Sequence, residues 1–367
     1  MSWAWRVARI RGVDVNVHAT FVIFLVWIAL ASHARGAPPE ATIATVLFVV
    51  AIFTSVLLHE FGHVVVAQHF NVGTRRITLL PIGGVAELER MPERPREELL
   101  VTLAGPAVNV VLGLFLYAVL QGTGREVVVP ATGLFGEGHY LARLFWMQVT
   151  LVVFNAIPAF PMDGGRVLRA LLAMRIGFAR ATRASAAVGQ AIALGFAFLG
   201  MFGNPMLLFI GLFVWIGAHT ERLGAETRVA IEGVSSRDAA EVSIMILGEA
   251  DSLALAARRL LAGAQRDFPV ADRAGEMVGV LTRDQLIAAL RDSGGQGRVG
   301  EAMTRPVMVA SATAPLSDVL ARMQQAASRV AVLTEGGTVV GVVTAENVAE
   351  LVMIRRALAE YDAAHTV

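Results

Sequence analysis

The 367-residue sequence contains no cysteine and no lysine, and only 17% of its residues are charged. The absence of cysteine excludes disulfide bonds, thiolate metal ligands and cysteine nucleophiles, so any metal must be held by histidine or carboxylate side chains. All 31 basic residues are arginine, which we attribute to codon bias in a GC-rich genome. The net charge of +1 gives no bulk attraction for nucleic acid, and we expect no nucleic-acid partner.

Long apolar segments dominate the first 220 residues, and 55% of the whole chain is hydrophobic. A membrane-spanning helix needs roughly 17–25 mostly apolar residues. We therefore predict a polytopic α-helical membrane protein with six transmembrane helices and a small β-hairpin or sheet element, followed by a soluble α/β domain. The six segments are residues 19–33, 42–69, 98–120, 144–163, 184–202 and 204–220.

The first apolar segment is short and follows three arginines, Arg6, Arg9 and Arg11. These features also suit a signal peptide, with "SHA" (residues 32–34) as its cleavage site. The stretch "GVDVNVHATF" (residues 12–21) is better explained by a strand that leads into a retained helix. Cleavage would leave the topology of the remaining chain unchanged, so the later predictions hold in both cases.

Arginines are distributed unevenly among the connections between these segments. Thirteen lie before the first segment, within residues 70–97 and around residues 166–183, whereas the alternate connections hold three. Because arginine and lysine concentrate on the cytoplasmic side of a membrane, we predict that the N-terminus, these two connections and the C-terminal domain are cytoplasmic. The protein is accordingly expected in the cell membrane as a multi-pass protein in contact with lipid.

An internal repeat occupies the C-terminal region. "FPVADRAGEMVGVLTRDQLIAAL" (268–290) aligns with "RVAVLTEGGTVVGVVTAENVAEL" (329–351). Each copy indicates the order helix, strand, turn, strand, helix. The two copies together predict one compact domain at about residues 240–356.

The most unusual polar cluster is "HEFGH" (residues 59–63), which lies inside an apolar segment. On a helix, His59 and His63 share one face and can reach a single ion, with Glu60 beside them to take a proton from a water molecule at the metal. Ionisable residues inside a membrane are costly and mark functional sites. The alternative is a pair of histidines that line a helix interface or a proton path.

A third ligand is expected from "NAIPAFPMDGGRVL" (residues 155–168), where Asp163 is the only acidic residue between Phe145 and Met174. His59 lies about 15 residues into its apolar segment and Asp163 lies 18 residues beyond Phe145, roughly 22 and 27 Å along a helix. Since the two segments run in the same direction, both residues should reach a similar depth. The alternative for Asp163 is a helix cap or a partner of Arg166.

These two motifs resemble those of the site-2 protease family of intramembrane zinc metalloproteases, over about residues 1–220. The resemblance implies that His59, His63 and Asp163 ligate one zinc ion per chain and that Glu60 is the catalytic base. It further implies that Asn155 contacts the substrate or its oxyanion. The second motif is formed by Asn155, Pro158, Pro161, Asp163, Gly164, Gly165 and Arg166.

Two further stretches match the family. "LAGPAVNVVLG" (residues 103–113) is similar to the pattern of the third span, which places Asn109 near the site as a substrate or oxyanion contact. "ITLLPIGGVAELER" (77–90) contains two strand-like runs around Gly83 and Gly84. We predict that it returns to the active site and pairs with unwound substrate by strand addition; the alternative is an ordinary exposed hairpin. Family members cleave transmembrane segments of proteins such as membrane-anchored regulators, for example anti-sigma factors.

The C-terminal repeats resemble a pair of CBS motifs. Many such pairs bind adenine nucleotides through a threonine followed three residues later by aspartate. Here Thr282 is followed at that position by Gln285 and Thr344 by Asn347, with Asp284 and Glu346 one residue out of register. Thr282, Asp284, Thr344 and Asn347 are therefore weaker candidates for a nucleotide site. The alternative is a structural module that dimerises the enzyme, since CBS pairs commonly associate face to face, or that caps its cytoplasmic opening.

The predicted organisation is a transmembrane metalloprotease domain, a linker, a regulatory CBS pair and a short tail. A rival hypothesis is a CBS-regulated transporter or channel whose histidines, glutamate and aspartate form an ion path. A conduction path does not require two histidines four residues apart with an intervening glutamate, and the spacing therefore favours a protease. The predicted boundaries are 1–222 for the transmembrane metalloprotease domain and 223–239 for the linker. They are 240–356 for the CBS pair, with copies at about 240–292 and 298–356, and 357–367 for the tail.

Overall fold

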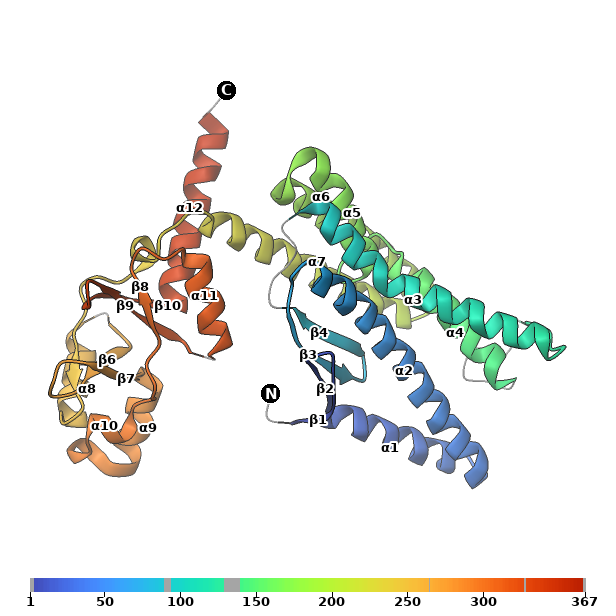
Figure 1. The fold of residues 1–367 in the computed structure, drawn as a ribbon, viewed down its shortest axis with the longest axis horizontal. Coiled ribbons are helices and arrows are strands. Elements are labelled where there is room, and N and C mark those ends of the chain that lie inside the picture. Colours follow the sequence, from blue (N-terminus) through green and yellow to red (C-terminus); the bar gives the residue numbers. More distant parts are fainter. Residues whose placement is uncertain (1–2, 89–93, 129–138, 264, 327, 366–367) are drawn as a thin grey trace. The chain divides into compact units, whose positions relative to one another are not determined.

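The computed structural model describes residues 3–88, 94–128, 139–263, 265–326 and 328–365. Part of the arginine-rich 70–97 connection and part of the 121–143 connection lie outside these residues. The chain divides into two compact units, residues 1–225 and 226–367 (Figure 1). Each unit is described by itself below.

The first unit begins with a β-hairpin whose second strand leads directly into a helix, as "GVDVNVHATF" predicts. Strands β1 (Ala4–Ile10) and β2 (Val13–His18) are antiparallel, and α1 (Ala19–Ala34) follows β2 without a break. The two turn residues, Arg11 and Gly12, both have positive φ, the conformation that a tight hairpin turn requires.

A second hairpin completes a four-stranded sheet in the order β1-β2-β3-β4. Strand β3 (Thr74–Leu80) is parallel to β2, and β4 (Gly83–Leu88) is antiparallel to β3. Both hairpin strands contact the long helix α2 (Pro39–His69), beside which they lie in Figure 1. Strand β4 is thus an edge strand of the sheet, placed against the helix that carries "HEFGH".

Four helices of the described residues are long and apolar enough to cross a membrane: α2, α3 (Pro95–Gly122), α6 (Phe178–Phe202) and α7 (Met206–Ile231). Both α2 and α3 begin with proline at the first turn and glutamate close behind it, a combination that suits a helix N-terminus. Helix α1 is apolar but shorter. The structure therefore supports a multi-pass membrane protein, whereas the predicted number of six spans is not reproduced.

The apolar segment predicted at 144–163 is not a single helix. Helix α4 (Tyr140–Asn155) ends before Pro158, and a new helix, α5 (Asp163–Ile176), begins at the aspartate. The break is physical, because Pro158 and Pro161 lack the N–H groups that a helix needs. Helix α3 packs against α2, α4 and α5, so it is the central element around which the polar residues of this unit gather.

The second unit shows the internal repeat as two copies of the same topology. Each copy has a three-stranded sheet in which the middle strand pairs in parallel on one side and antiparallel on the other. The sheets have the orders β5-β6-β7 and β10-β9-β8. The first copy contains β5 (Leu247–Gly248), α8 (Leu253–Ala262), β6 (Phe268–Ala271), β7 (Met277–Leu281) and α9 (Arg283–Ser293). The second contains β8 (Val309–Ser311), α11 (Leu316–Gln325), β9 (Val330–Glu335), β10 (Thr338–Thr344) and α12 (Ala345–His365).

Three short helices complete the described part of the second unit. They are the 3-10 helices η1 (Ser236–Ala239) and η2 (Gly294–Gln296) and the helix α10 (Val299–Ala302). Two helices run across predicted domain boundaries, which stay predictions. Helix α7 continues to Ile231 inside the predicted linker, and α12 continues to His365 through the predicted tail, because both sequences remain helix-forming beyond their apolar cores.

Candidate metal centre

Three buried side chains converge between α2 and α5. His59 and His63 lie one turn apart on α2, and Asp163 is the first residue of α5; each is 6–7% exposed. Asp163 Oδ2 lies 3.1 Å from His59 Nε2 and 3.4 Å from His63 Nε2, and the two Nε2 atoms are 3.1 Å apart. The structure thus brings together the two histidines and the distant aspartate.

The donor atoms are arranged for a cation. Asp163 Oδ2 is buried without a hydrogen-bond partner in the described residues. It faces the Nε2 atoms of His59 and His63, so three electron-rich atoms lie close together. A tetrahedral zinc ion with ligands at about 2.0–2.1 Å separates its ligand atoms by roughly 3.3 Å, which matches the distances found. Among the residues that the structure describes, this is the only cluster of three histidine or acidic side chains able to hold an ion.

Each of the two imidazoles is oriented by a hydrogen bond at its Nδ1 atom. His63 Nδ1 donates to the carbonyl oxygen of Val101 at 2.8 Å, and His59 Nδ1 donates to Asn109 Oδ1. A proton on each Nδ1 leaves each Nε2 with a lone pair directed at the centre, the state that a metal ligand requires. Asn109 is completely buried, and its Nδ2 donates to Gln148 Oε1 at 2.7 Å.

The substrate or oxyanion role expected for Asn109 stays a prediction, and the structure shows partners for its amide that the sequence does not indicate. The family resemblance implies a substrate or oxyanion contact; in the structure the amide is sealed behind His59 and both of its ends are engaged. Gln148 was missed by the sequence reasoning. Its signal is an amide inside the mostly apolar segment 144–154, and polar residues in such segments tend to be functional.

Glycine allows α3 to pass directly over the two histidines. A Cβ atom at Gly105 would lie 2.3 Å from His63 Nε2 and 2.7 Å from His59 Nε2, far inside any normal contact distance. Gly105 belongs to "LAGPAVN", the stretch that the sequence analysis connected with the third span. The glycine therefore keeps open the space in front of the donor atoms.

Strand β4 lies against Glu60. A Cβ atom at Gly84 would be 2.8 Å from Glu60 Cγ, so the strand approaches this side chain as closely as glycine permits. The neighbouring Gly83 has a φ of +138°, which other residues rarely adopt. Glu60 is half-buried, and Asn155 is a half-buried residue at the end of α4; the substrate-binding roles of Asn155, Gly83 and Gly84 stay predictions.

A second buried polar cluster lies further along α5. Arg169 is 1% exposed in its side chain and contacts Glu98 of α3 at 2.6 and 2.8 Å and Glu221 of α7 at 3.2 Å. Its guanidinium also lies 5.1 Å from the ring centres of Phe160 and Phe178. The sequence alone does not indicate this cluster, because its three charged members are scattered over more than 120 residues.

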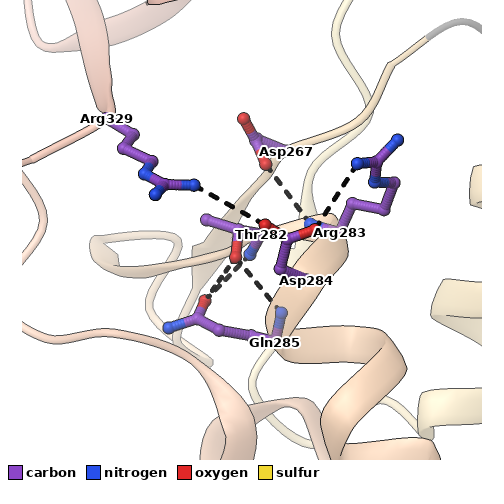
Figure 2. Close-up of polar contacts among 6 residues, drawn as sticks. All are labelled: Asp267, Thr282, Arg283, Asp284, Gln285 and Arg329. Carbon is purple, nitrogen blue, oxygen red and sulfur yellow. Dashed lines mark hydrogen bonds and ion pairs between the residues drawn. The ribbon is translucent and has the colours of Figure 1, made fainter.

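In the second unit, which contains the CBS-like repeats, the candidate nucleotide-binding threonines serve as helix caps. Thr282 and Gln285 form a reciprocal capping box at the start of α9, and Asp284 faces Arg283 and Arg329 at 3.5 and 3.6 Å (Figure 2). Thr344 and Asn347 repeat the arrangement at α12, with 2.7 Å between Thr344 Oγ1 and Asn347 Oδ1. These side chains satisfy the helix ends themselves.

A cavity of about 520 Å³ adjoins the second of these caps. Its charged lining is mostly acidic, and burial, reinforced by Glu346 and Asp284, raises the pKa of Asp267. Burial likewise raises the pKa of Glu241, with Glu350 and Asp267 adding to the effect. The charge balance disfavours a ligand with several phosphates. The lining includes Asp238, Glu241, Arg266, Asp267, Thr344, Glu346, Asn347 and Glu350.

Comparisons with known proteins agree with these features. Residues 47–136 and 134–196 match the model of peptidase family M50, and residues 299–354 match that of the CBS domain. The chain is 31% identical over 346 residues to the zinc metalloprotease MJ0392 of Methanocaldococcus jannaschii, covering 94% of each protein. It is 32% identical over 372 residues to Rip3 of Mycobacterium tuberculosis, covering 95% of this chain and 92% of that protein.

A solved structure of a site-2 protease from Methanocaldococcus jannaschii is also similar, with 35% identity and a TM-score of 0.45 over 60% of this chain and 95% of that one. The comparisons favour a protease over the rival transporter or channel. The chain belongs to peptidase family M50, the site-2 proteases, and is a zinc metalloprotease with a CBS domain.

Proposed function

We propose that the first unit hydrolyses a peptide bond within a membrane-spanning segment of another protein, with His59, His63 and Asp163 as the zinc ligands. The observation that carries the proposal is the convergence of three buried donor atoms at 3.1–3.4 Å with no protein cation among them. Zinc supplies Lewis acidity, which activates water and polarises the scissile carbonyl. The remaining steps are assigned to side chains and backbone of this chain.

Glu60 is proposed as the general base. It follows His59 directly on α2, so the helix places its carboxylate beside the metal ligands, and it is only half-buried. From this position it can take a proton from the attacking water and return it to the leaving amine. A positioned general base contributes about 10²–10⁴-fold to a reaction rate. Asn155 is proposed to contact the substrate or its oxyanion.

The β4 strand is proposed to hold the substrate. A membrane-spanning helix hides its carbonyl groups in internal hydrogen bonds, so it must unwind before hydrolysis. Strand β4 is an edge strand and lies against Glu60 at Gly84, which supports backbone pairing with the unwound segment. A membrane-anchored regulator, for example an anti-sigma factor, is the expected kind of substrate.

The CBS unit is proposed to regulate this activity from the cytoplasmic side, the orientation that the arginine distribution indicates. Its cavity suits an adenosine-containing ligand with little negative charge, because Glu241, Asp267 and Glu346 line it. Dimerisation through this unit is a further part of the proposal, because CBS pairs commonly associate face to face.

The test uses full-length protein in detergent or proteoliposomes with a model transmembrane substrate. For Glu60→Gln we expect one zinc ion per chain by mass spectrometry and cleavage reduced by about 10²–10⁴-fold. His59→Ala, as the matched control, should lose the zinc as well. Undiminished cleavage by Glu60→Gln would contradict the assigned mechanism, and undiminished zinc in His59→Ala would contradict the ligand set.

A further inference from the structure

A chain of buried hydrogen bonds runs from His59 to the backbone of its own helix through three other side chains. We infer that Ser55, Gln148 and Asn109 act as positioning residues that hold His59 in the tautomer with Nδ1 protonated and Nε2 facing the metal. The inference rests on the proposed function, in which His59 is a zinc ligand. It adds two residues, Ser55 and Gln148, that touch neither metal nor substrate.

This chain of hydrogen bonds is continuous, and its side chains are buried. Asn109 Nδ2 donates to Gln148 Oε1 at 2.7 Å, Gln148 Nε2 donates to Ser55 Oγ at 2.8 Å, and Ser55 Oγ donates to the carbonyl of Ala51 at 3.2 Å. Asn109, Gln148 and Ser55 are 0%, 1% and 6% exposed. They come from α3, α4 and α2 respectively, so the chain joins three helices behind one ligand.

The direction of every bond follows from the last acceptor. A backbone carbonyl can only accept, so Ser55 turns its hydroxyl proton toward Ala51 and offers lone pairs to Gln148. Gln148 must then present Nε2 to Ser55 and Oε1 to Asn109. Asn109 in turn presents Nδ2 to Gln148 and Oδ1 to His59. An amide oxygen accepts only, which requires the proton of His59 on Nδ1.

The alternative orientation shows why this matters. If the amide of Asn109 were reversed, its Nδ2 would donate to His59 Nδ1 and the imidazole proton would move to Nε2, which could then not bind a metal. His63 avoids this problem by donating directly to the carbonyl of Val101. His59 has an amide behind it, whose two ends are interchangeable in shape, and only the rest of the chain distinguishes them.

A purely structural role for these residues would look different in experiment. Loss of Gln148 would then lower the stability of the protein without changing its affinity for zinc. Met147 offers a matched control, because it neighbours Gln148 on α4 and is 8% exposed. It packs against Phe48 and Ile52 of α2 and takes no part in the series of hydrogen bonds. Met147→Ala should destabilise the helix packing and leave zinc affinity within about threefold of the wild-type value.

The experiment measures zinc affinity by chelator competition and the tautomer of His59 by ¹⁵N NMR of the histidine-labelled, metal-free full-length protein. Gln148→Met keeps the side-chain length but removes both bonds, and we expect a zinc Kd that rises 10–100-fold together with protonation of His59 Nε2 in part of the population. Gln148→Glu should restore both values, because a protonated carboxyl group can accept from Asn109 and donate to Ser55. Ser55→Ala should give the same changes in weaker form.

An unchanged zinc Kd and tautomer in Gln148→Met would overturn the inference, as would a Gln148→Glu protein as impaired as Gln148→Met. If Gln148→Met does not fold, Ser55→Ala decides between the same outcomes. Failure of the proposed function is recognised separately, since His59→Ala would then retain zinc. If His59→Ala loses zinc and both Gln148→Met and Ser55→Ala bind it normally, the ligand assignment stands and the positioning role is wrong.

Discussion

Helix α5 carries two buried polar clusters six residues apart, one at Asp163 and one at Arg169. At Arg169 the guanidinium contacts Glu98 and Glu221 at 2.6–3.2 Å, so positive and negative groups of the protein neutralise one another. At Asp163 the carboxylate faces two imidazole nitrogens, and no arginine is within ion-pair distance of it in the described residues. The same helix thus holds a complete ion-pair cluster and an incomplete one.

The difference separates structural from functional polarity. A buried charge needs a partner and satisfied hydrogen bonds to be tolerated. The Arg169 cluster meets this requirement with protein groups alone and ties α3, α5 and α7 together. In the Asp163 cluster, no arginine or lysine among the described residues meets it, and a bound cation would do so. Burial of polar groups does not mark a functional site by itself, whereas burial without internal compensation does.

The largest effect is expected from breaking the incomplete cluster. Asp163→Asn removes the only charged ligand, and we expect the zinc Kd to rise by more than about 100-fold and cleavage to fall by at least about 10³-fold. The measurements are metal analysis after dialysis and cleavage of a transmembrane substrate. Arg166→Gln, three residues further along α5, is the control for a charge change that should spare zinc binding.

Metal removal provides a second view of the same cluster. Zinc at 1,000 times its Kd stabilises a folded protein by about 4 kcal/mol, so chelation should lower the thermal midpoint of the wild-type membrane unit. The midpoint of Asp163→Asn should hardly respond to the chelator. Equal responses of the two proteins would show that the stabilising metal binds elsewhere.

The next effect concerns the edge strand, which reaches the incomplete cluster through Glu60. Val85→Pro removes one N–H and stiffens β4, and we expect cleavage to be abolished with one zinc ion per chain retained. Val7→Pro on β1 is the matched control, because Val7 lies at a bulge on the opposite edge of the sheet and is exposed. Normal cleavage by Val85→Pro would contradict substrate pairing with β4.

Breaking the complete cluster should affect stability and leave the metal in place. Arg169→Met leaves Glu98 buried without its partner, which costs about 3–5 kcal/mol. We expect this loss in the free energy of unfolding, measured with denaturant in mixed micelles, while zinc content per folded molecule stays unchanged. Adding Glu98→Gln should recover part of the stability, since the uncompensated charge is then removed. A zinc loss as large as that of Asp163→Asn would erase the distinction between the two clusters.

The sequence predicted the parts of the site that follow from local spacing. His59 and His63 share a helix face through their four-residue separation, and Asp163 stood out as an isolated carboxylate in an apolar region. The repeat in the C-terminal unit likewise predicted the strand and helix order. The histidine pair and the repeat depend on spacing and internal similarity, which a single sequence contains, whereas Asp163 was inferred from its isolation and its depth along the segment.

The remaining features depend on tertiary packing and could not be predicted. Nothing in the sequence states which backbone or amide group bonds to each histidine Nδ1, so Gln148 and Ser55 were missed and the bond from His59 to Asn109 was not predicted. The break between α4 and α5 was visible as Pro158 and Pro161, but the length of the following non-helical segment was not. The partners of Arg169 come from helices far apart in the chain, and only the fold brings them together.

The smallest effect is expected at the acidic cavity of the CBS unit, a milder case of incomplete compensation. Because burial raises the pKa of Asp267, its folded form binds a proton more tightly than the unfolded chain does. The contribution of Asp267 to stability is therefore greatest below the unfolded pKa of about 3.9 and declines as pH rises through the folded pKa. Asp267→Asn removes this decline and keeps the oxygen that accepts from the Arg283 N–H.

We accordingly expect Asp267→Asn to stabilise the CBS unit by a few tenths of a kcal/mol at pH 7, and by less near pH 4. Hydrogen exchange of the β6 and β7 amides in the full-length protein measures this difference. The same substitution should bring the affinity for ATP closer to that for adenosine, because one negative charge has left the cavity. If the stability of Asp267→Asn relative to wild type is lower at pH 7 than at pH 4, the prediction is wrong. The carboxylate of Asp267 is then compensated as fully as those around Arg169.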